Sequence, residues 1–574
     1  MRKNIKQIIT IMTITATLLT GCAANQSNTT DTTNNGVTSS NSNSTTGSSN
    51  ASIETITTST TSEVIVDTEF TARDLEVGYE ESTATKVVFN GNTGTVTGNG
   101  AAFSEGILKI NDEGTYVISG TLKDGQIIVE AEESDKIQIV LKDTNITSSN
   151  NAPIYVKSAD KVFITLEDGT INTLTDSSEY IQTDDNTVDG AIFSTADITI
   201  NGSGTLNING NYKHGIVSKD DIVITSGTIN ITAIKDAING KDSVRIKDGT
   251  LTLSAETGNG IQSKNDSNTT KGYVYIAGGK ITVVKSQEGI EGTIIQIDDG
   301  TVDITSQDDG LNATSAASSE TENATTTATT ATVTTVVNNT LDTKTTDVAT
   351  DITGVEMMST TTEGEVDAES SATVTTDDKA PREGKGDFGE GFNGGGEFEV
   401  DSNAYIYING GVIHIDAAGD GIDSNGSISI TGGTITVSGP TDSRNGALDY
   451  NGTADISGGT VVIAGSAGMA QGFSEASTQY SILYSLTEVS NANTEITLKD
   501  ENGNVVISYT PNKQYQTIVI STNELAKDKT YTLTSGDQTA DITLTSMVTS
   551  NVQAGMGGQG GFGQRPAQGG MGRP

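Results

Sequence analysis

The stretch GIVSKDDIVITSGTINITA (215–233) is followed almost at once by AINGKDSVRIKDGTLTLSA (237–255), and the two share one pattern. Each has a short apolar start, an alternating strand, a glycine turn and a second alternating strand. The pattern returns in GIQSKNDSNTTKGYVYIAGGKITVVKS (260–286), GIEGTIIQIDDGTVDITS (289–306), GIDSNGSISITGGTITVSG (421–439) and ALDYNGTADISGGTVVIAG (447–465). Period-two alternation inside a short repeat is typical of a solenoid with several strands per turn.

The repeat predicts an all-β fold, namely a right-handed parallel β-helix (solenoid) with a small C-terminal β cap. Alternation points Ile222, Ile224, Ile229 and Ile231 inward, where they would stack on equivalent residues of neighbouring coils. Separate β-sandwiches would share neither a period nor a column of turn glycines. That column comprises Gly169, Gly204, Gly227, Gly249, Gly279, Gly300, Gly411, Gly433 and Gly459.

The chain divides by composition into five parts. We expect a lipoprotein signal peptide at 1–21 and a disordered Ser/Thr/Asn tether at 22–65. The β-helix would span 66–478, interrupted by a low-complexity insertion at about 314–400. Alternating segments at 479–547 predict a small cap of β-strands, which would cover the open end of the solenoid. A flexible Gly/Met-rich tail would follow at 548–574.

The N-terminus reads as an export signal. A basic start precedes the apolar run IITIMTITATLL (8–19), which is too short to span a bilayer as a helix. It ends in Leu19-Thr20-Gly21-Cys22, which resembles a bacterial lipobox and implies lipidation of Cys22. We therefore expect a protein held by a lipid anchor on the extracellular face of the cell membrane. An ordinary secreted protein with a stray cysteine is the alternative.

The charge balance narrows the classes of partner. The chain has 74 acidic and 32 basic residues, a net charge of -42, so nucleic acid would be repelled. An anionic membrane surface is equally unfavourable, leaving the lipid anchor as the expected membrane contact. Divalent cations, and polymers bridged by them, suit this charge better. A single cysteine excludes a disulfide framework and a Cys-based zinc site.

Acidic and amide residues recur at the short start of successive coils. Stacking would bring them together, and carboxylates and amides are the oxygen ligands that Ca²⁺ prefers. The candidate Ca²⁺ ligands are Asp236, Asn239, Glu288, Glu291, Asp308, Asp309, Asn312, Asp420, Asp423 and Asp449. Asn445 would continue the row, with an ambiguity of one residue. The alternative is that these residues cap turns by bonding the local backbone. His214 and His414 are expected at the surface.

The stretches at 420–439, 445–459 and 465–486 resemble a bacterial carbohydrate-binding β-helix family formerly classed as a domain of unknown function. The resemblance covers about residues 105–540, less the insertion. It implies an extracellular, calcium-containing β-helix with the architecture of pectate lyases. It also implies binding of plant cell-wall polysaccharide, such as polygalacturonate or cellulose, without established catalysis. The acid-Gly-Ile-acid pattern carries over to Glu288/Glu291 and Asp420/Asp423, whereas an amide replaces the second acid at Asp309/Asn312.

Three functions follow. The first is a monomeric carbohydrate-binding module, with Tyr273, Tyr275, Tyr405 and Tyr407 turned outward to stack on sugars. These tyrosines could instead pack beneath the insertion. The second is a Ca²⁺-dependent lyase, for which Lys235, Lys264, Lys285 or Arg444 would be the base. The third is a non-catalytic adhesin or spacer, suggested by a partial threonine column that Lys280 and Val412 interrupt. We expect binding rather than catalysis.

Overall fold

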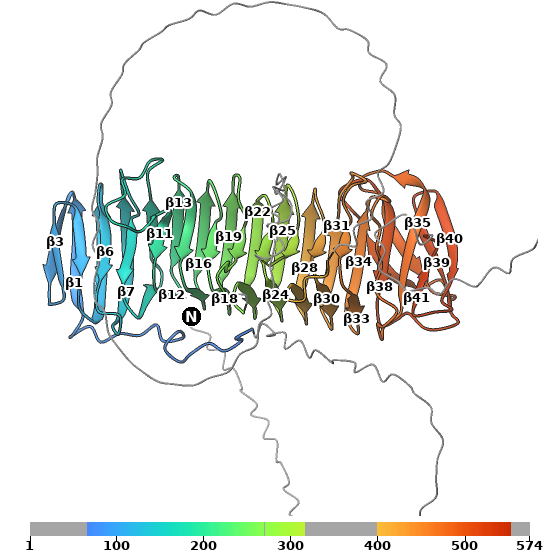
Figure 1. Cartoon of the computed structure of the whole chain (residues 1–574), viewed down its shortest axis with the longest axis horizontal. Helices are drawn as coiled ribbons and strands as arrows, with labels where there is room; N and C mark the ends of the chain where they lie inside the picture. Colours follow the sequence, from blue (N-terminus) through green and yellow to red (C-terminus); the bar gives the residue numbers. More distant parts are fainter. Residues whose placement is uncertain (1–65, 269, 316–398, 553–574) are drawn as a thin grey trace, which may run out of the picture. The chain divides into compact units, whose positions relative to one another are not determined.

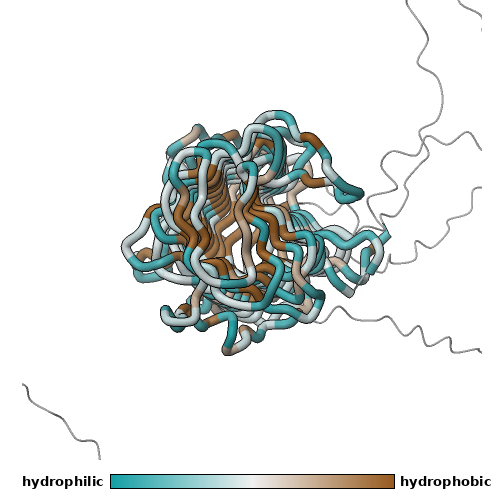
Figure 2. Tube along the Cα trace, turned by 90° about the vertical axis from the view of Figure 1, so that its left-hand side faces the viewer, coloured by the Kyte–Doolittle hydropathy of each residue, from teal (hydrophilic) through white to brown (hydrophobic). Residues whose placement is uncertain are grey.

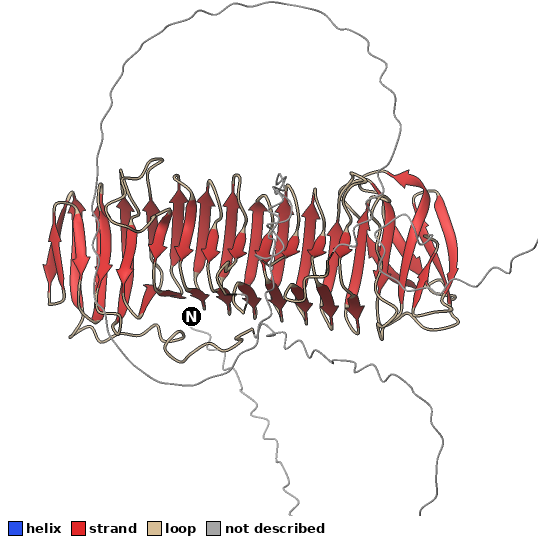
Figure 3. Ribbon diagram, viewed as in Figure 1, coloured by secondary structure: helices blue, strands red, loops and turns tan. Residues whose placement is uncertain are grey.

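The computed structural model describes residues 66–268, 270–315 and 399–552. All regular structure within these ranges is β-strand, and the strands follow one another as stacked coils (Figures 1 and 3). No helix of the described ranges is long and apolar enough to cross a membrane. The expected signal peptide, Cys22, the tether, nearly all of the insertion and most of the tail lie outside the described residues.

Each regular coil contributes one strand to each of three columns. The first column is a 12-stranded sheet, parallel except where β3 meets β4. Its strands are β3 (Ala101–Ser104), β4 (Ile107–Ile110), β6 (Gln126–Glu130), β8 (Ile154–Ser158), β11 (Gly190–Ser194), β14 (His214–Ser218), β17 (Ile238–Gly240), β20 (Ile261–Ser263), β23 (Ile290–Gly292), β26 (Leu311–Ala313), β29 (Ile422–Ser424) and β32 (Leu448–Tyr450).

The second and third columns belong to one large sheet and are likewise parallel along the coils. The second column has β9 (Lys161–Leu166), β12 (Asp197–Gly202), β15 (Asp221–Ile224), β18 (Ser243–Ile246), β21 (Tyr273–Ile276), β24 (Ile294–Ile297), β27 (Tyr405–Ile408), β30 (Ser427–Ile430) and β33 (Ala454–Ile456). The third has β10 (Ile171–Thr175), β13 (Thr205–Gly210), β16 (Thr228–Ala233), β19 (Thr250–Ala255), β22 (Lys280–Lys285), β25 (Thr301–Ser306), β28 (Val412–Ala417), β31 (Thr434–Ser438) and β34 (Thr460–Gly465).

Aliphatic side chains at fixed register fill the interior of the coils. Ile222 pairs with Val244 and, one coil further, Val244 pairs with Val274; all three are fully buried. The end-on view shows hydrophobic segments lining the inside of the coils and hydrophilic ones outside (Figure 2). The parallel sheets of stacked coils therefore have the β-helix-like build that the repeat predicts.

The coil pattern continues across the insertion. β24 before it pairs in register with β27 after it, so that Ile294 faces Tyr405. β26, which ends at Ala313, pairs with β29 in the same way. The register of the coils is therefore the same on both sides of the insertion.

The turn glycines mark one corner of each coil. Gly249 has φ 126° and Gly459 has φ 90°, values that favour glycine over residues with a side chain. A Cβ at Gly459 would also collide with the backbone of Gly432 in the preceding coil. Gly204 stands in this column beside Gly227, since Thr205 pairs with Thr228, but in its coil the positive φ belongs to Gly202.

The first coils are less regular. β1 (Thr85–Gly91) and β2 (Thr93–Thr97) form an antiparallel hairpin at the N-terminal end of the stack. β5 (Gly114–Leu122) and the long β7 (Lys136–Thr147) span the second and third columns together, since β7 pairs with both β9 and β10.

The segment before β1 lies along the second column and does not form a coil. Asp74 is fully buried, accepts a 2.6 Å hydrogen bond from the Thr199 hydroxyl and pairs with Lys161 at 2.9 Å. Further toward the N-terminus, the Arg245 guanidinium pairs with Asp67. We call residues 66–78 the N-terminal strap. The expected β-helix boundary at residue 66 thus falls on a segment that packs outside the coils.

After β34 the parallel pattern stops. β38 (Tyr515–Ser521) pairs antiparallel with β34 and with β35 (Ser481–Ser490), and β41 (Val548–Ser550) joins β35. A separate four-stranded antiparallel sheet contains β36 (Ile496–Lys499), β37 (Val505–Tyr509), β39 (Thr530–Ser535) and β40 (Gln538–Thr543). These strands share a second hydrophobic core, built around Tyr515 and Leu533, and cover the sheet edge that β34 would otherwise expose.

Candidate functional site

The polar residues at the start of the coils stack in two rows. The first row runs through the first-column strands β17 to β32, one residue per coil at matching register: Asn239, Gln262, Glu291, Asn312, Asp423 and Asp449. The second row precedes those strands and is joined by backbone hydrogen bonds between coils: Asp236, Asn259, Glu288, Asp309 and Asp420. We call the two rows the acid ladder. Gly446, and not Asn445, occupies the next position, because Gly421 donates to the Gly446 carbonyl.

At its N-terminal end the ladder is saturated by hydrogen-bond donors. Asp236 is buried and receives a bond of 2.6 Å from the Asn239 amide and one of 2.9 Å from the Asn259 backbone. His214, expected at the surface, lies in the ladder and places Nδ1 3.1 Å from the Asp236 carboxylate. Burial opposes ionisation of Asp236, but these partners outweigh it and hold its pKa below the ordinary value. We call this group of four residues the amide end.

The middle of the ladder is a transition. Glu291 is buried, but Lys264 pairs with it and the Gln262 amide donates to it. The Asn259 amide reaches Glu291 at 2.6 Å and Glu288 at 3.2 Å. Lys264, a candidate base in the sequence, is therefore tied to a carboxylate. Glu291 has its own counter-ion, whereas Glu288 shares amide donors only.

At the C-terminal end, carboxylates crowd together. One oxygen from each of Asp309, Asp420 and Asp423 lies within 4.8 Å of the others. Asp309 accepts a 2.6 Å bond from the Asp420 backbone, and Asp420 accepts one of 2.6 Å from the Gly446 backbone. One oxygen of Asp309 and one of Asp420 are thus each anchored by the backbone of the next coil. We call Asp309, Asp420 and Asp423 the acid end.

The electrostatics of the acid end are opposite to those of the amide end. Burial, then the neighbouring carboxylates, raise the pKa of Asp309 to about 8 and that of Asp420 to about 7. The same causes raise the pKa of Asp423 well above its ordinary value. Glu288 has its pKa raised to about 8 by burial and by Glu291 and Asp309. At neutral pH these groups therefore either hold protons or require a cation.

Two side chains at this end, Asp423 and Asn312, have oxygen atoms that no donor from the described residues reaches. No hydrogen bond or ion pair from the described part of the chain reaches the Asp423 carboxylate. Asn312, which pairs with Asp423 in register, is 9% exposed and donates its amide to Glu288 at 3.2 Å. Its Oδ1 is buried without a hydrogen-bond partner. A buried acceptor without a donor is costly, and a cation would satisfy it.

The two remaining ligand candidates lie at the border of the cluster. Asp449 neighbours Asp423 in register but accepts bonds from the Gln471 amide at 2.7 Å and the Tyr450 backbone at 2.9 Å. Asp308 accepts a 3.1 Å bond from the Gln287 amide. A side chain at Gly419 would collide with the carboxylates of Asp308 and Asp309, so this glycine permits their close approach.

Sequence reasoning missed a second acidic cluster, formed by Asp197, Asp220 and Asp221 between β12 and β15. Its signal was the register of Asp197 with Asp221, whose backbone donates to the Asp197 carboxylate. Cations of the protein already approach it, since Lys161 lies 4.0 Å from Asp197 and Arg245 lies 3.6 Å from Asp221. This cluster therefore needs an external cation less than the acid end does.

The four tyrosines lie outside the core as expected, but two of them are covered. Tyr273 and Tyr275 are 7% and 5% exposed, because Val66 and Phe70 of the N-terminal strap pack on them. The Phe70 ring stacks on Tyr275 with centroids 6.0 Å apart. The expectation that these two rings offer faces to a sugar is therefore wrong, and the cover is the strap.

Tyr405 and Tyr407 lie two coils away from that pair, since β24 separates β21 from β27. Both are partly exposed, and their rings stack on each other with centroids 5.2 Å apart. Two of the other candidate bases form surface ion pairs, Lys285 with Glu256 at 2.6 Å and Arg444 with Asp442 at 2.6 Å, and Lys235 is exposed.

The described chain is thus an all-β protein of stacked, β-helix-like coils with a row of acids along one column. Residues 104–378 match the family model described as carbohydrate-binding domain-containing protein. A curated protein of that description from Acetivibrio thermocellus is 38% identical over 151 residues, which is 26% of this chain and 53% of the relative. The chain thus spans about half the length of that relative. The expected resemblance to a carbohydrate-binding family is confirmed by both matches.

Among solved structures, the chain is similar to one titled a polysaccharide lyase-like protein from C. thermocellum, studied as a gadolinium derivative. The sequence identity is 36%, covering 40% of this chain and 95% of the other, with a TM-score of 0.38.

Proposed function

We propose that this protein is a lipid-anchored, cell-surface protein that binds plant cell-wall polysaccharide with the help of Ca²⁺ held at the acid end. Its coils would form a right-handed parallel β-helix. The relationship to carbohydrate-binding proteins supports the class of ligand. The observation that carries the proposal is the unpartnered Asp423 carboxylate beside the orphaned Asn312 Oδ1.

The ligand atoms at the acid end fit Ca²⁺ by their chemistry. Carboxylate oxygens of Asp309, Asp420 and Asp423 and the amide oxygen of Asn312 are hard donors, and Ca²⁺ takes 6–8 such oxygens. Glu288 and Asp449 border the same group. Bound there, the ion would neutralise the carboxylates and offer its remaining coordination positions to uronate oxygens of the polymer. The backbone donors of Asp420 and Gly446 hold the carboxylates in place for this role.

An acidic polymer is the ligand that this site favours. The chain carries a net charge of -42, so a polygalacturonate chain would approach against repulsion. A shared cation removes that repulsion locally. We therefore expect retention on acidic pectin that depends on Ca²⁺ and falls with chelation, and binding to a neutral glucan such as cellulose that does not need this site.

A pull-down on polygalacturonate beads, with Ca²⁺ or with EDTA, tests the proposal. Asp420→Ala combined with Asp423→Ala should abolish Ca²⁺-dependent retention. The matched control combines Asp248→Ala with Asp299→Ala, which removes two carboxylates from exposed turns where each bonds the following glycine. Native mass spectrometry would count the bound ions. Equal retention of both double variants, or of the wild type in EDTA, would contradict a bridging role for the metal.

Lyase activity is the second candidate, supported by Lys264 beside the ladder. The Lys264 ammonium is engaged in an ion pair with Glu291, so it is not free to act on a substrate as a base. We therefore expect no unsaturated product when polygalacturonate and Ca²⁺ are incubated with the protein. Steady turnover that is lost in Lys264→Met would replace the binding proposal with an enzymatic one.

The lipid anchor is tested separately. Cys22→Ser should move the protein from the membrane fraction to the medium, and metabolic labelling with a fatty acid should mark the wild type but not the variant. Unchanged fractionation of Cys22→Ser would favour an ordinary secreted protein.

A further inference from the structure

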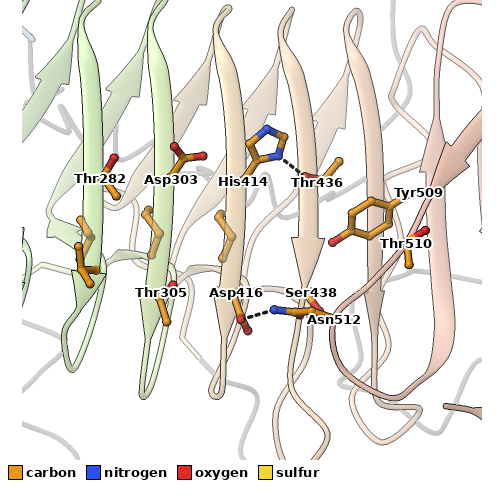
Figure 4. A pocket seen from close by; sticks show the side chains of 14 residues that line it. Thr282, Asp303, Thr305, His414, Asp416, Thr436, Ser438, Tyr509, Thr510 and Asn512 are labelled. Atoms are coloured by element: carbon orange, nitrogen blue, oxygen red, sulfur yellow. Dashed lines mark hydrogen bonds between the residues drawn. The ribbon is translucent and has the colours of Figure 1, made fainter. Parts of the chain in front are cut away.

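A groove lies where the coils meet the C-terminal cap, away from the acid ladder. Its volume is about 460 Å³, and it opens over the outer face of β22, β25, β28 and β31 (Figure 4). The segment that follows β37 in the cap forms its far wall, with Tyr509, Thr510 and Asn512. The acid ladder, in contrast, follows the strands of the 12-stranded sheet.

The floor of the groove presents hydrogen-bonding groups at the spacing of the coils. Thr282, Asp303, His414 and Thr436 stand at matching register on four successive strands. Thr305, Asp416 and Ser438 form a second row beside them. Neighbouring strands lie about 4.8 Å apart, so a polymer lying across the strands would meet one polar group per coil.

The groove also has an aromatic ring in its wall and an exposed apolar side chain, against which a sugar ring can pack. The Tyr509 ring stands at the cap end of the first row, beside Thr436 (Figure 4). Val284 contributes an apolar surface that is 52% exposed. Binding sites for small ligands commonly combine apolar or aromatic walls with a few placed polar groups.

The cap is fixed over the groove by polar contacts to one coil. Lys513 pairs with Asp416 at 2.8 Å and donates to the Ala417 carbonyl, and the Asn512 amide donates to Asp416. Within the first row, His414 Nδ1 and the Thr436 hydroxyl lie 2.6 Å apart. The wall and floor therefore keep a defined distance before any ligand arrives, which lowers the entropic cost of binding.

The charge of the groove selects among carbohydrates. Its described lining residues include the carboxylates of Asp303 and Asp416 but no lysine or arginine, and Lys513 behind the wall compensates Asp416 alone. A polyuronate would be repelled by Asp303, whereas hydroxyl groups of a neutral sugar can donate to it.

We propose that this groove between the coils and the cap is a second carbohydrate site, which binds a neutral polysaccharide chain without a metal. The proposal rests on carbohydrate binding as the function of the protein. It separates two ligand classes within one chain: acidic polymer at the acid end with Ca²⁺, and neutral polymer in the groove.

Titration of the full chain with soluble hydroxyethylcellulose in EDTA tests the groove, with polygalacturonate in Ca²⁺ as the parallel measurement. His414→Ala combined with Tyr509→Ala should weaken binding of the neutral polymer about tenfold or more and leave polygalacturonate binding unchanged. Tyr509→Phe keeps the ring and should retain most of the affinity. Tyr484→Ala is the matched control, because Tyr484 is also a partly buried tyrosine packed on the cap core.

The outcomes separate the two proposals. If the wild type binds polygalacturonate in Ca²⁺ but not the neutral polymer, the groove proposal is overturned and the proposed function stands. If it binds neither, both fail. If the neutral polymer binds equally to wild type and to a correctly folded His414→Ala/Tyr509→Ala variant, its site lies elsewhere and the groove proposal is wrong. Thermal unfolding of each variant establishes that the fold is intact.

Discussion

The two ends of the acid ladder are built from the same backbone but treat charge in opposite ways. At the amide end, Asp236 accepts hydrogen bonds from the Asn239 amide and the Asn259 backbone and lies beside His214, and its pKa is lowered. At the acid end, Asp423 receives no donor from the described residues and its pKa is raised. Asp236 lies in the second row of the ladder and Asp423 in the first, but both rows run along the starts of successive coils, so the residues in the neighbouring coils make the difference.

The comparison shows how a repeat can hold both a structural and a functional feature. An acid of the ladder that meets a side-chain amide is satisfied within the protein, as Asp236 is by Asn239. Where an acid in one coil is followed by another acid in the next coil, as at Asp309 and Asp420, folding alone does not compensate the charge. A buried charge without a partner is expensive, so such a site persists where something outside the chain offsets the cost.

The largest expected effect is at the amide end. Asp236→Ala removes the acceptor of two donors, the Asn239 amide and the Asn259 backbone, so the free energy of unfolding should fall by about 3–5 kcal/mol. Since the donors come from the protein, added Ca²⁺ should not restore the loss. Urea unfolding of the wild type and the variant, each with Ca²⁺ and with EDTA, measures the loss of stability and whether Ca²⁺ restores it. Recovery in Ca²⁺ would mean that the metal also occupies the amide end, and the contrast between the two ends would disappear.

The second expected effect is the pH dependence of the acid end. The pKa of Asp309 is about 8 and that of Asp420 about 7 in the folded chain, against an ordinary value of 3.8. Because the folded pKa is the higher one, the stability contributed by protonation is complete below 3.8 and is lost as pH rises through 7 and 8. In EDTA, the free energy of unfolding should therefore decline from pH 4 to pH 8.

Calcium should reverse that decline. The ion binds the ionised carboxylates, so stabilisation by Ca²⁺ should be small at pH 5 and large at pH 8. At a free concentration of 100 times Kd, it amounts to about 2.7 kcal/mol. Melting curves at the two pH values, with Ca²⁺ or EDTA, provide the measurement. A gap between the curves that is the same at both pH values would show that the acid end is not the site of the ion.

Much of the ladder could be predicted from the sequence because the repeat fixes register. Once Ile290, Leu311 and Ile422 are recognised as equivalent core positions, the neighbouring Glu291, Asn312 and Asp423 must stack. The same logic placed the strand after the insertion. The period carries this information because each coil is bonded only to the coils beside it.

The features that the sequence did not reveal are contacts outside the period. The strap residue Phe70 covers Tyr275, and nothing in the local pattern of either segment indicates the other. The groove joins strands β22 to β31 to a cap segment at Tyr509, far along the chain.

The smallest expected effect separates charge from shape at the acid end. Asp423→Asn keeps the volume of the side chain but removes a carboxyl group that no described residue satisfies and whose pKa burial and the neighbouring carboxylates raise, so in EDTA at pH 8 the free energy of unfolding should rise by about 1 kcal/mol. The same variant should lose most of the stabilisation by Ca²⁺, because an amide is a weaker ligand than a carboxylate. Asp449→Asn is the matched control. Asp449 neighbours Asp423 in register but already accepts hydrogen bonds from Gln471 and the Tyr450 backbone. Its replacement should therefore raise the free energy of unfolding in EDTA by less than Asp423→Asn does. If Asp423→Asn were instead destabilising in EDTA, the Asp423 carboxylate would have to be satisfied within the folded chain, and the acid end would resemble the amide end.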